Sequence, residues 1–186
     1  LQEQNVHIWD EWVDENNTIG RGYGYQIAKF NQIDKLIETL KTNPRDRRMI
    51  VSAWNPQQFD EMALPPCHYA FQVTVIDNKL NLLWNQRSVD TMLGLPFNIA
   101  SYALLLHLLA KESGLEEGKL VGFLADVHIY ENHLEGAKEQ LSRDPEKFPL
   151  PKIETENWNS IFDWHAENSK IINYQSYEKI PFEIAI

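Results

Sequence analysis

The only cysteine of the chain, Cys67, follows two prolines in the segment LPPCHYAF, residues 64–71. Proline fixes φ and holds the residue before it extended, so the backbone entering Cys67 is rigid and its thiol has a defined direction. A lone cysteine is often only a small buried apolar side chain. Its place at the start of a predicted strand, and nearby arginines that favour the thiolate, make Cys67 a candidate nucleophile.

Arginine is concentrated in two places. The segment NPRDRRM holds three arginines within four positions, and NQRSVD places Arg87 beside Ser88. A solvated charged turn is one interpretation of the first segment, and a set of planar donors for phosphate is the other. In a strand, Ser88 and Asp90 point to one face and Arg87 to the opposite face. The residues that form these clusters are Arg45, Arg47, Arg48 and Arg87.

Further polar candidates lie in the second half of the chain. On a strand, His128 and Tyr130 of DVHIYENH share a face and can hold one polar ligand group. A metal site is not predicted there, because the spacing to His133 is not HExxH and no cysteine is near. Asn98 stands where a helix is expected to begin, so it is either an N-cap or an amide that binds the edge of a base.

The composition narrows the class of protein. The 186 residues are enough for one domain, and the net charge of −10 disfavours nucleic acid and anionic membranes as partners. One cysteine excludes an internal disulfide and indicates a reduced, cytoplasmic setting. Residues 91–110 carry no charge, but they include proline, asparagine and histidine, so a buried helix is favoured over a membrane span.

Hydrophobic periodicity predicts alternating helices and strands. Apolar residues at i, i+3, i+4 and i+7 predict a helix over 32–42, and residues 5–12 resemble a short amphipathic helix. Strands are expected at 48–55, on both sides of Asp77-Asn78 as a hairpin, at 119–130 and near the C-terminus. A long apolar helix begins near Phe97 and ends at Gly114, and an exposed helix covers 132–143. The predicted fold is α+β, with a mixed or antiparallel sheet packed against that long buried helix.

Several strings together resemble the thymidylate synthase family, in family order and over nearly the whole chain. They are HIWDEW, YGYQ, DRRMIVSAWN, MALPPCHYAFQ, QRSVDTMLGLPFNIASYALL, DVHIYENH and QLSRDPEKFPLP. The resemblance implies a single domain over 1–186 without the N-terminal segment usual in the family. It also implies conversion of dUMP to dTMP with 5,10-methylenetetrahydrofolate, which supplies both the carbon and the hydride, so that neither a metal nor a nicotinamide is needed.

The resemblance also implies a role for each matching residue. Cys67 would add to C6 of the uracil ring, and Arg87 with Ser88 would hold the phosphate, assisted by Arg47 and Arg48 from the partner subunit of a homodimer. Asn98 would bind the uracil edge, and His128 and Tyr130 would bind the deoxyribose 3′-hydroxyl. Asp90 would bind the pterin, Trp9 and Trp12 would line the folate side, and Tyr23 would help water to remove the C5 proton. Ile186 would belong to a closing lid, and His68 would lie near the active site.

Two alternatives remain open at this point. A pyrimidine-nucleotide hydroxymethylase shares the fold and the cysteine, although Asn98 favours uracil over cytosine and Trp9 favours methylation. A truncated, inactive relative would act as a binding protein instead. Departures from the family pattern, at Ala125 and in the segment 20–30, are expected to tune folate affinity.

Overall fold

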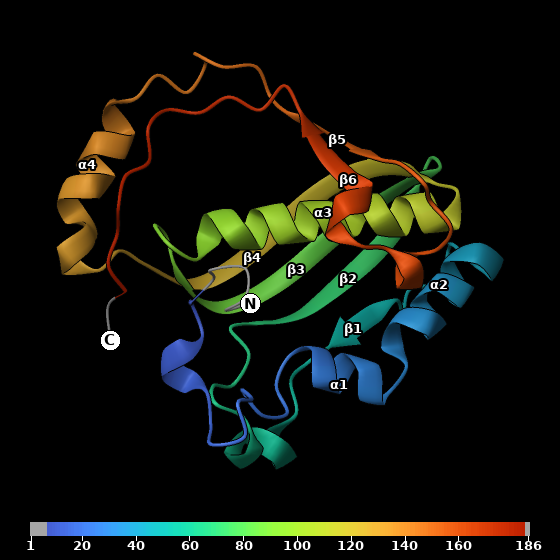
Figure 1. Ribbon diagram of the computed structural model, residues 1–186. Coiled ribbons are helices and arrows are strands. Elements are labelled where there is room, and N and C mark those ends of the chain that lie inside the picture. The colour runs from blue at the N-terminus through green and yellow to red at the C-terminus, as the bar shows by residue number, and fades with distance from the viewer. Residues whose placement is uncertain (1–6, 185–186) are drawn as a thin grey trace.

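The computed structural model describes residues 7–184 and contains a four-stranded mixed sheet in the order β1-β2-β3-β4 (Figure 1). The strands are β1 (Ile50–Ser52), β2 (His68–Ile76), β3 (Lys79–Asp90) and β4 (Glu116–His128). β2 is antiparallel to both β1 and β3, whereas β3 and β4 run parallel. The predicted hairpin is confirmed, since Asp77 and Asn78 join β2 to β3 with φ of 50° and 61°, the left-handed values that a tight two-residue turn requires.

Helix α3 (Leu95–Ser113) connects β3 to β4 and packs on one face of the sheet. It ends as predicted at Gly114, whose φ of 67° suits glycine. It begins earlier than predicted, because Pro96 occupies its first turn and Gly94 is the N-cap. The interpretation of Asn98 as the N-cap is therefore wrong. Burial of α3 is one-sided, since Phe97 is 70% exposed while Leu109 is fully buried.

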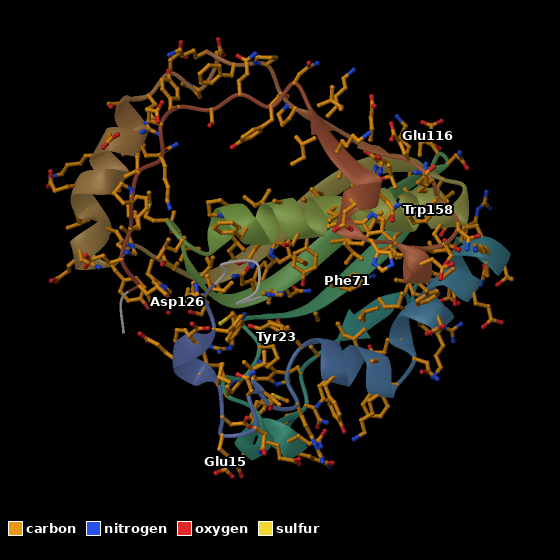
Figure 2. All side chains as sticks on the ribbon, in the orientation of Figure 1. Glu15, Tyr23, Phe71, Glu116, Asp126 and Trp158 are labelled. Atoms are coloured by element: carbon orange, nitrogen blue, oxygen red, sulfur yellow. The ribbon has the colours of Figure 1, made fainter. Side chains whose placement is uncertain are left out.

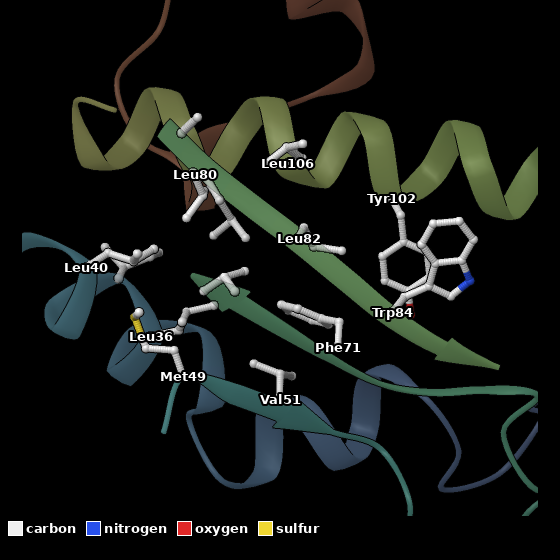
Figure 3. Close-up of a cluster of buried hydrophobic side chains, with 14 residues drawn as sticks. Leu36, Leu40, Met49, Val51, Phe71, Leu80, Leu82, Trp84, Tyr102 and Leu106 are labelled. Carbon is white, nitrogen blue, oxygen red and sulfur yellow. The ribbon is translucent and has the colours of Figure 1, made fainter. Parts of the chain in front are cut away.

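The hydrophobic core lies between the sheet and the helices α2 (Gln32–Thr42) and α3 (Figure 3). Leu36 and Leu40 of α2 come from the predicted periodic stretch. The rings of Trp84 on β3 and Tyr102 on α3 are stacked, with centroids 5.3 Å apart. The stack lies nearer the carboxyl end of β3 than Leu80 and Leu82 do (Figure 3), and β4 runs parallel to β3. The core therefore supports the residues at that end of the sheet.

Three elements differ from the sequence prediction. Within the described part of residues 5–12 there is only the 3-10 turn η2 (Asp10–Trp12). Helix α1 (Gly24–Lys29) was missed, because it follows a segment of glycine-rich turns. Strand β5 (Lys152–Thr155) was also missed, and it pairs with the predicted C-terminal strand β6 (Ser169–Ile172) in a separate two-stranded sheet.

The C-terminal part forms an arm beside the sheet. The predicted exposed helix is α4 (Leu134–Ser142), and the tail from residue 173 runs back along it (Figure 1). Short 3-10 turns complete the chain, at η3 (Pro56–Glu61), η4 (Glu131–His133), η5 (Ile161–Asp163) and η6 (Ala166–Asn168). No helix within residues 7–184 is long and apolar enough to cross a membrane.

The sheet face opposite α3 is exposed and partly apolar. The register aligns Ile50, Gln72, Leu83 and Val121 in one row across all four strands. The three apolar members of this row are 55%, 38% and 44% exposed, and Phe123 in the next row is 60% exposed. Apolar side chains gathered on one face mark a surface suited to association.

Candidate active site

The backbone around Cys67 is held from both sides. Its N–H donates to the phenolic oxygen of Tyr23 at 3.0 Å, and its carbonyl accepts from the N–H of Arg87 at 2.9 Å. Pro66, directly before it, is buried. Cys67 itself is a free, half-buried cysteine. The thiol therefore stands on fixed backbone at the start of β2, where the two prolines predicted it.

The guanidinium of Arg87 is fastened beside this thiol. Its Nε donates to the carbonyl of Pro66 at 3.1 Å and its Nη2 to the carbonyl of Pro65 at 2.7 Å. The same Nη2 lies 3.7 Å from Cys67 Sγ. No acceptor within residues 7–184 binds Nη1, so this edge of the guanidinium remains available to an anion.

Tyr23 contacts both the backbone of Cys67 and the ring of Trp9 in the N-terminal turn. Figure 2 shows Tyr23 at the same end of the sheet as Asp126. Burial is the main cause that raises the pKa of Tyr23 to about 12, so the phenol is neutral at physiological pH. Its backbone has a φ of 40° and a ψ of −108°, an uncommon conformation for a residue with a side chain. This strain is retained at a position where the hydroxyl meets the nucleophile.

His68 lies behind Tyr23, with ring centroids 4.8 Å apart. Its Nδ1 is 3.0 Å from the hydroxyl of Tyr102, and burial lowers the pKa of His68 below its ordinary value. The pKa of Tyr102 is raised, first by burial and then by Tyr23. This group of neutral polar rings joins the site to the core.

Asn98 is oriented by a buried amide that the sequence analysis missed. Gln86 is 2% exposed, and its Nε2 donates to Asn98 Oδ1 at 2.9 Å and to the carbonyl of Ser88. Its Oε1 accepts from Trp84 Nε1 at 3.1 Å. The indole N–H therefore fixes which way the Gln86 amide faces, and Gln86 in turn fixes the amide of Asn98. The available signal was the alternation of Leu80, Leu82 and Trp84 as buried positions, which Gln86 continues.

The carboxyl ends of β3 and β4 bring the remaining candidates together. Asp90 pairs with His128 in the parallel register, and the His128 ring meets the Tyr130 ring edge-on at 5.1 Å. Asp90 Oδ1 accepts from the N–H groups of Met92 and Leu93 at 2.9 and 3.3 Å, which begins the turn into α3. The predicted pairing of His128 with Tyr130 is present, although Tyr130 lies just beyond the strand.

Ser88 and Arg87 start on opposite faces of β3, because the strand continues unbroken to Asp90. The long side chain of Arg87 nevertheless reaches across to the segment before β2. The two predicted tryptophans, Trp9 and Trp12, lie close together, with ring centroids 5.9 Å apart. The ring centroid of Trp9 is 6.0 Å from that of Tyr23. Ile186 lies outside the described residues.

Arg47 and Arg48 lie away from Cys67 within one chain. They form the exposed turn between α2 and β1, where Arg48 pairs with Asp46 at 3.2 Å. β1 runs antiparallel to β2, which places Arg48 near the far end of β2, about 20 Å from Cys67 at the strand rise of 3.3 Å per residue. Arg48 also lines a cavity of 880 Å³ that does not include Cys67.

Within residues 7–184 no three His, Cys, Asp or Glu side chains are grouped so that they could hold a metal ion. The same end of the sheet holds a fixed thiol beside a guanidinium, an oriented amide and a His–Tyr pair. This arrangement is expected of enzymes in which a thiolate acts on an anionic substrate.

Comparison with known proteins agrees with this class. The sequence model of the family described as thymidylate synthase matches residues 1–186. The structure is similar to the thermostable thymidylate synthase A from Bacillus subtilis, with a TM-score of 0.92, 37% sequence identity, and coverage of 100% of this chain and 69% of that chain. The chain belongs to the thymidylate synthase family of folate-dependent methyltransferases, and the predicted α+β fold is confirmed.

Proposed function

We propose that this protein converts dUMP to dTMP by reductive methylation with 5,10-methylenetetrahydrofolate, through a covalent bond between Cys67 Sγ and C6 of the uracil ring. The observation that carries the proposal is the 3.7 Å approach of the Arg87 guanidinium to that sulfur, on backbone fixed by Pro65 and Pro66. A thiolate is the reactive form, and a neighbouring cation stabilises it. Addition to C6 would place electron density on C5, the carbon that is methylated.

The substrate phosphate would bind at the free edge of Arg87. Nη1 has two N–H groups directed away from the proline carbonyls, and the Ser88 hydroxyl would add a further donor. In this position Arg87 serves the phosphate and the thiolate together. Tyr23 remains neutral, so its hydroxyl can accept from Cys67 N and still donate its own hydrogen to water near C5.

Asn98 would recognise the uracil edge. Because Gln86 donates to Asn98 Oδ1, the Asn98 Nδ2 group faces elsewhere and is free to donate to a carbonyl such as O4 of uracil, while Oδ1 keeps a second lone pair for N3–H. His128 and Tyr130 would hold the deoxyribose 3′-hydroxyl at the carboxyl end of β4.

The reduced folate fits the remaining groups. It would supply the one-carbon unit and the hydride. The Asp90 carboxylate, with its second oxygen not used in the turn, would accept from N–H groups of the pterin, and the rings of Trp9 and Trp12 offer an apolar surface beside Tyr23. The tail that ends at Ile186 would close over the bound molecules and exclude water.

A homodimer would complete the phosphate site. Arg47 and Arg48 are too far from Cys67 to act in their own chain, and the exposed row of Ile50, Leu83 and Val121 offers an apolar surface for a second copy. Mixing Cys67→Ala protein with Arg47→Ala/Arg48→Ala protein tests this. If the arginines act across the interface, random mixing restores about a quarter of wild-type activity, since half of the dimers hold one intact site of two. Absence of any recovery would contradict the shared site.

Product analysis tests the activity itself. The protein is incubated with dUMP and 5,10-methylenetetrahydrofolate, and the mass of the nucleotide is determined, with Cys67→Ala as the control. Gain of a methyl group, together with formation of dihydrofolate, supports the proposal. Gain of a hydroxymethyl group would identify the hydroxymethylase alternative, and an unchanged nucleotide would support the inactive binding protein.

A further inference from the structure

A cavity of 880 Å³ opens beside the strand β1, and Cys67 is not among its lining residues. The elements α1, α2 and β1, which neighbour one another in Figure 1, supply most of the lining, and η3 supplies the rest. Small-molecule sites commonly enclose roughly 300–1,000 Å³, so this cavity has the size of a ligand site. Of the exposed apolar row across the sheet, only Ile50 borders the cavity, so most of the cavity lies outside the surface proposed for a second copy.

Buried amides give the cavity a fixed floor. Gln26 and Gln58 are 1% and 8% exposed. Gln58 Oε1 accepts from Gln26 Nε2 at 2.9 Å and from Asn55 Nδ2 at 3.0 Å. Gln26 Nε2 also donates to the carbonyl of Arg21 at 2.8 Å. Amides that are held in this way cannot turn over without losing bonds, so the cavity keeps its shape without a ligand.

The outer edge of β1 is closed to a further strand. Gln32 Oε1 accepts from the N–H of Ser52, and Gln32 Nε2 donates to the carbonyl of Ser52, each at 2.8 Å. The N–H of Ile50 donates to the carbonyl of Arg48 at 2.8 Å. A peptide that adds to a sheet edge needs these donors, and both are already used. The cavity is therefore suited to a small molecule rather than to an extended peptide.

The charge around the cavity is opposite in sign to that of the chain. Its lining carries Lys29, Lys35 and Arg48 against the single carboxylate of Glu61, whereas the net charge of the whole chain is −10. Glu61 is already paired with Arg21 at 2.7 Å. Neither lysine takes part in an ion pair within the described residues 7–184. Their ammonium groups are therefore donors that an anion can use.

Two accessible aromatic rings line the same cavity. Trp54 is 39% exposed and Phe30 is 49% exposed. The Trp54 ring is held edge-on by Phe59 at 4.8 Å and by Tyr69 at 5.5 Å, so its orientation is fixed while part of it remains accessible. A flat heterocycle stacks favourably on such an indole, whichever base it is.

We propose that this cavity is a second ligand site, which binds a nucleoside phosphate with its phosphates at Lys29 and Lys35 and its base against Trp54. The phosphates match the unpaired ammonium groups, and the base matches the indole. An inorganic anion alone would leave the aromatic rings uncovered. The site shares neither lysine nor tryptophan with the proposed dUMP site, and it does not depend on the proposed function.

Titration calorimetry with dTTP, ATP and tripolyphosphate tests the site. We expect both nucleotides to bind, and tripolyphosphate, which has no base, to bind about 5- to 150-fold more weakly. Lys29→Gln and Lys35→Gln each weaken the binding of all three probes by about tenfold or more. Lys41→Gln is the matched control and leaves binding unchanged, because Lys41 also belongs to α2 but pairs with Glu112 outside the cavity.

Two further variants separate the parts of the ligand and the two sites. Trp54→Leu weakens both nucleotides to the affinity of tripolyphosphate and leaves tripolyphosphate itself unchanged. Arg87→Ala alters the candidate active site, and nucleotide binding in the cavity stays at the wild-type affinity.

Three outcomes would overturn the second site. They are a wild-type protein that binds neither nucleotide, binding that is lost in Arg87→Ala but kept in both lysine variants, and binding that falls equally in Lys41→Gln. Product formation from dUMP, measured separately, reports on the proposed function, and its absence would leave the second site in place. Thermal melts identify any variant that fails to fold. Lys29 and Lys35 are exposed, so their variants are expected to fold and they decide.

Discussion

The amide of Gln86 is predicted to set the preference for uracil over cytosine. Uracil presents an acceptor at O4 and a donor at N3, and cytosine presents the reverse. In the proposed site, Asn98 would suit uracil only while Gln86 holds its Oδ1. In Gln86→Met the side chain keeps its shape but loses both amide groups, so the Asn98 amide can turn over to suit either base.

The size of the effect follows from the bond that is lost. Turning Asn98 in the wild type replaces the 2.9 Å bond from Gln86 Nε2 with two facing N–H groups, at a cost of about 1–3 kcal/mol. Removing that cost lowers the ratio of dUMP to dCMP affinity by about 5- to 150-fold. Binding of dUMP itself weakens only about twofold, since one of two orientations of Asn98 still fits.

Titration calorimetry with dUMP and with dCMP measures the ratio. Gln58→Met is the matched control, because Gln58 is also a buried glutamine but bonds to Gln26 and Asn55 away from the site. Both variants lose stability, and only Gln86→Met loses selectivity. A wild-type ratio in Gln86→Met would refute the proposed orientation of Asn98.

Three further predictions concern stability. Because the pKa of Tyr23 is raised in the folded protein, the unfolded chain loses this proton at lower pH. The free energy of unfolding therefore falls as pH rises from 10 to about 12. In denaturant titrations, Tyr23→Phe removes that part of the loss. Because the pKa of His68 is lowered in the folded protein, the unfolded chain takes up this proton at higher pH, so the free energy of unfolding falls below pH 6.5. His68→Gln flattens that dependence. An unchanged profile would contradict the burial of His68 as a neutral ring. Gly122→Ala would place a Cβ 2.5 Å from the Trp84 ring, and we expect it to lower the free energy of unfolding in urea by about 1–3 kcal/mol. Gly24→Ala is the control, because the space around Gly24 is open, and it stays within about 1 kcal/mol of the wild type.

Much of the framework could be predicted because it depends on local patterns. The hairpin at Asp77-Asn78 and the end of α3 at Gly114 follow from residues that tolerate positive φ. The rigid backbone that leads into Cys67 follows from two prolines. These features depend on backbone preferences of a few adjacent residues, and the fold leaves them unchanged.

The features that were missed depend on contacts distant in sequence. Gln86 and Asn98 are joined across the turn between β3 and α3, and His133 meets Glu183 some fifty positions later. The N-cap alternative for Asn98 was wrong, because Pro96 and the turn at Asp90 start the helix earlier. Pairings of this kind become visible only when the strands and the tail have their places.

Intact-protein mass spectrometry after incubation with 5-fluoro-dUMP and 5,10-methylenetetrahydrofolate tests the central claim most directly. The fluorine at C5 blocks the final proton loss, so a covalent complex should accumulate. We predict that the wild-type mass increases by the sum of both ligands, that peptide mapping places the bond on Cys67, and that Cys67→Ala shows no increase. A folded wild-type protein that binds both ligands without any covalent product, or an adduct that persists in Cys67→Ala, would contradict the account.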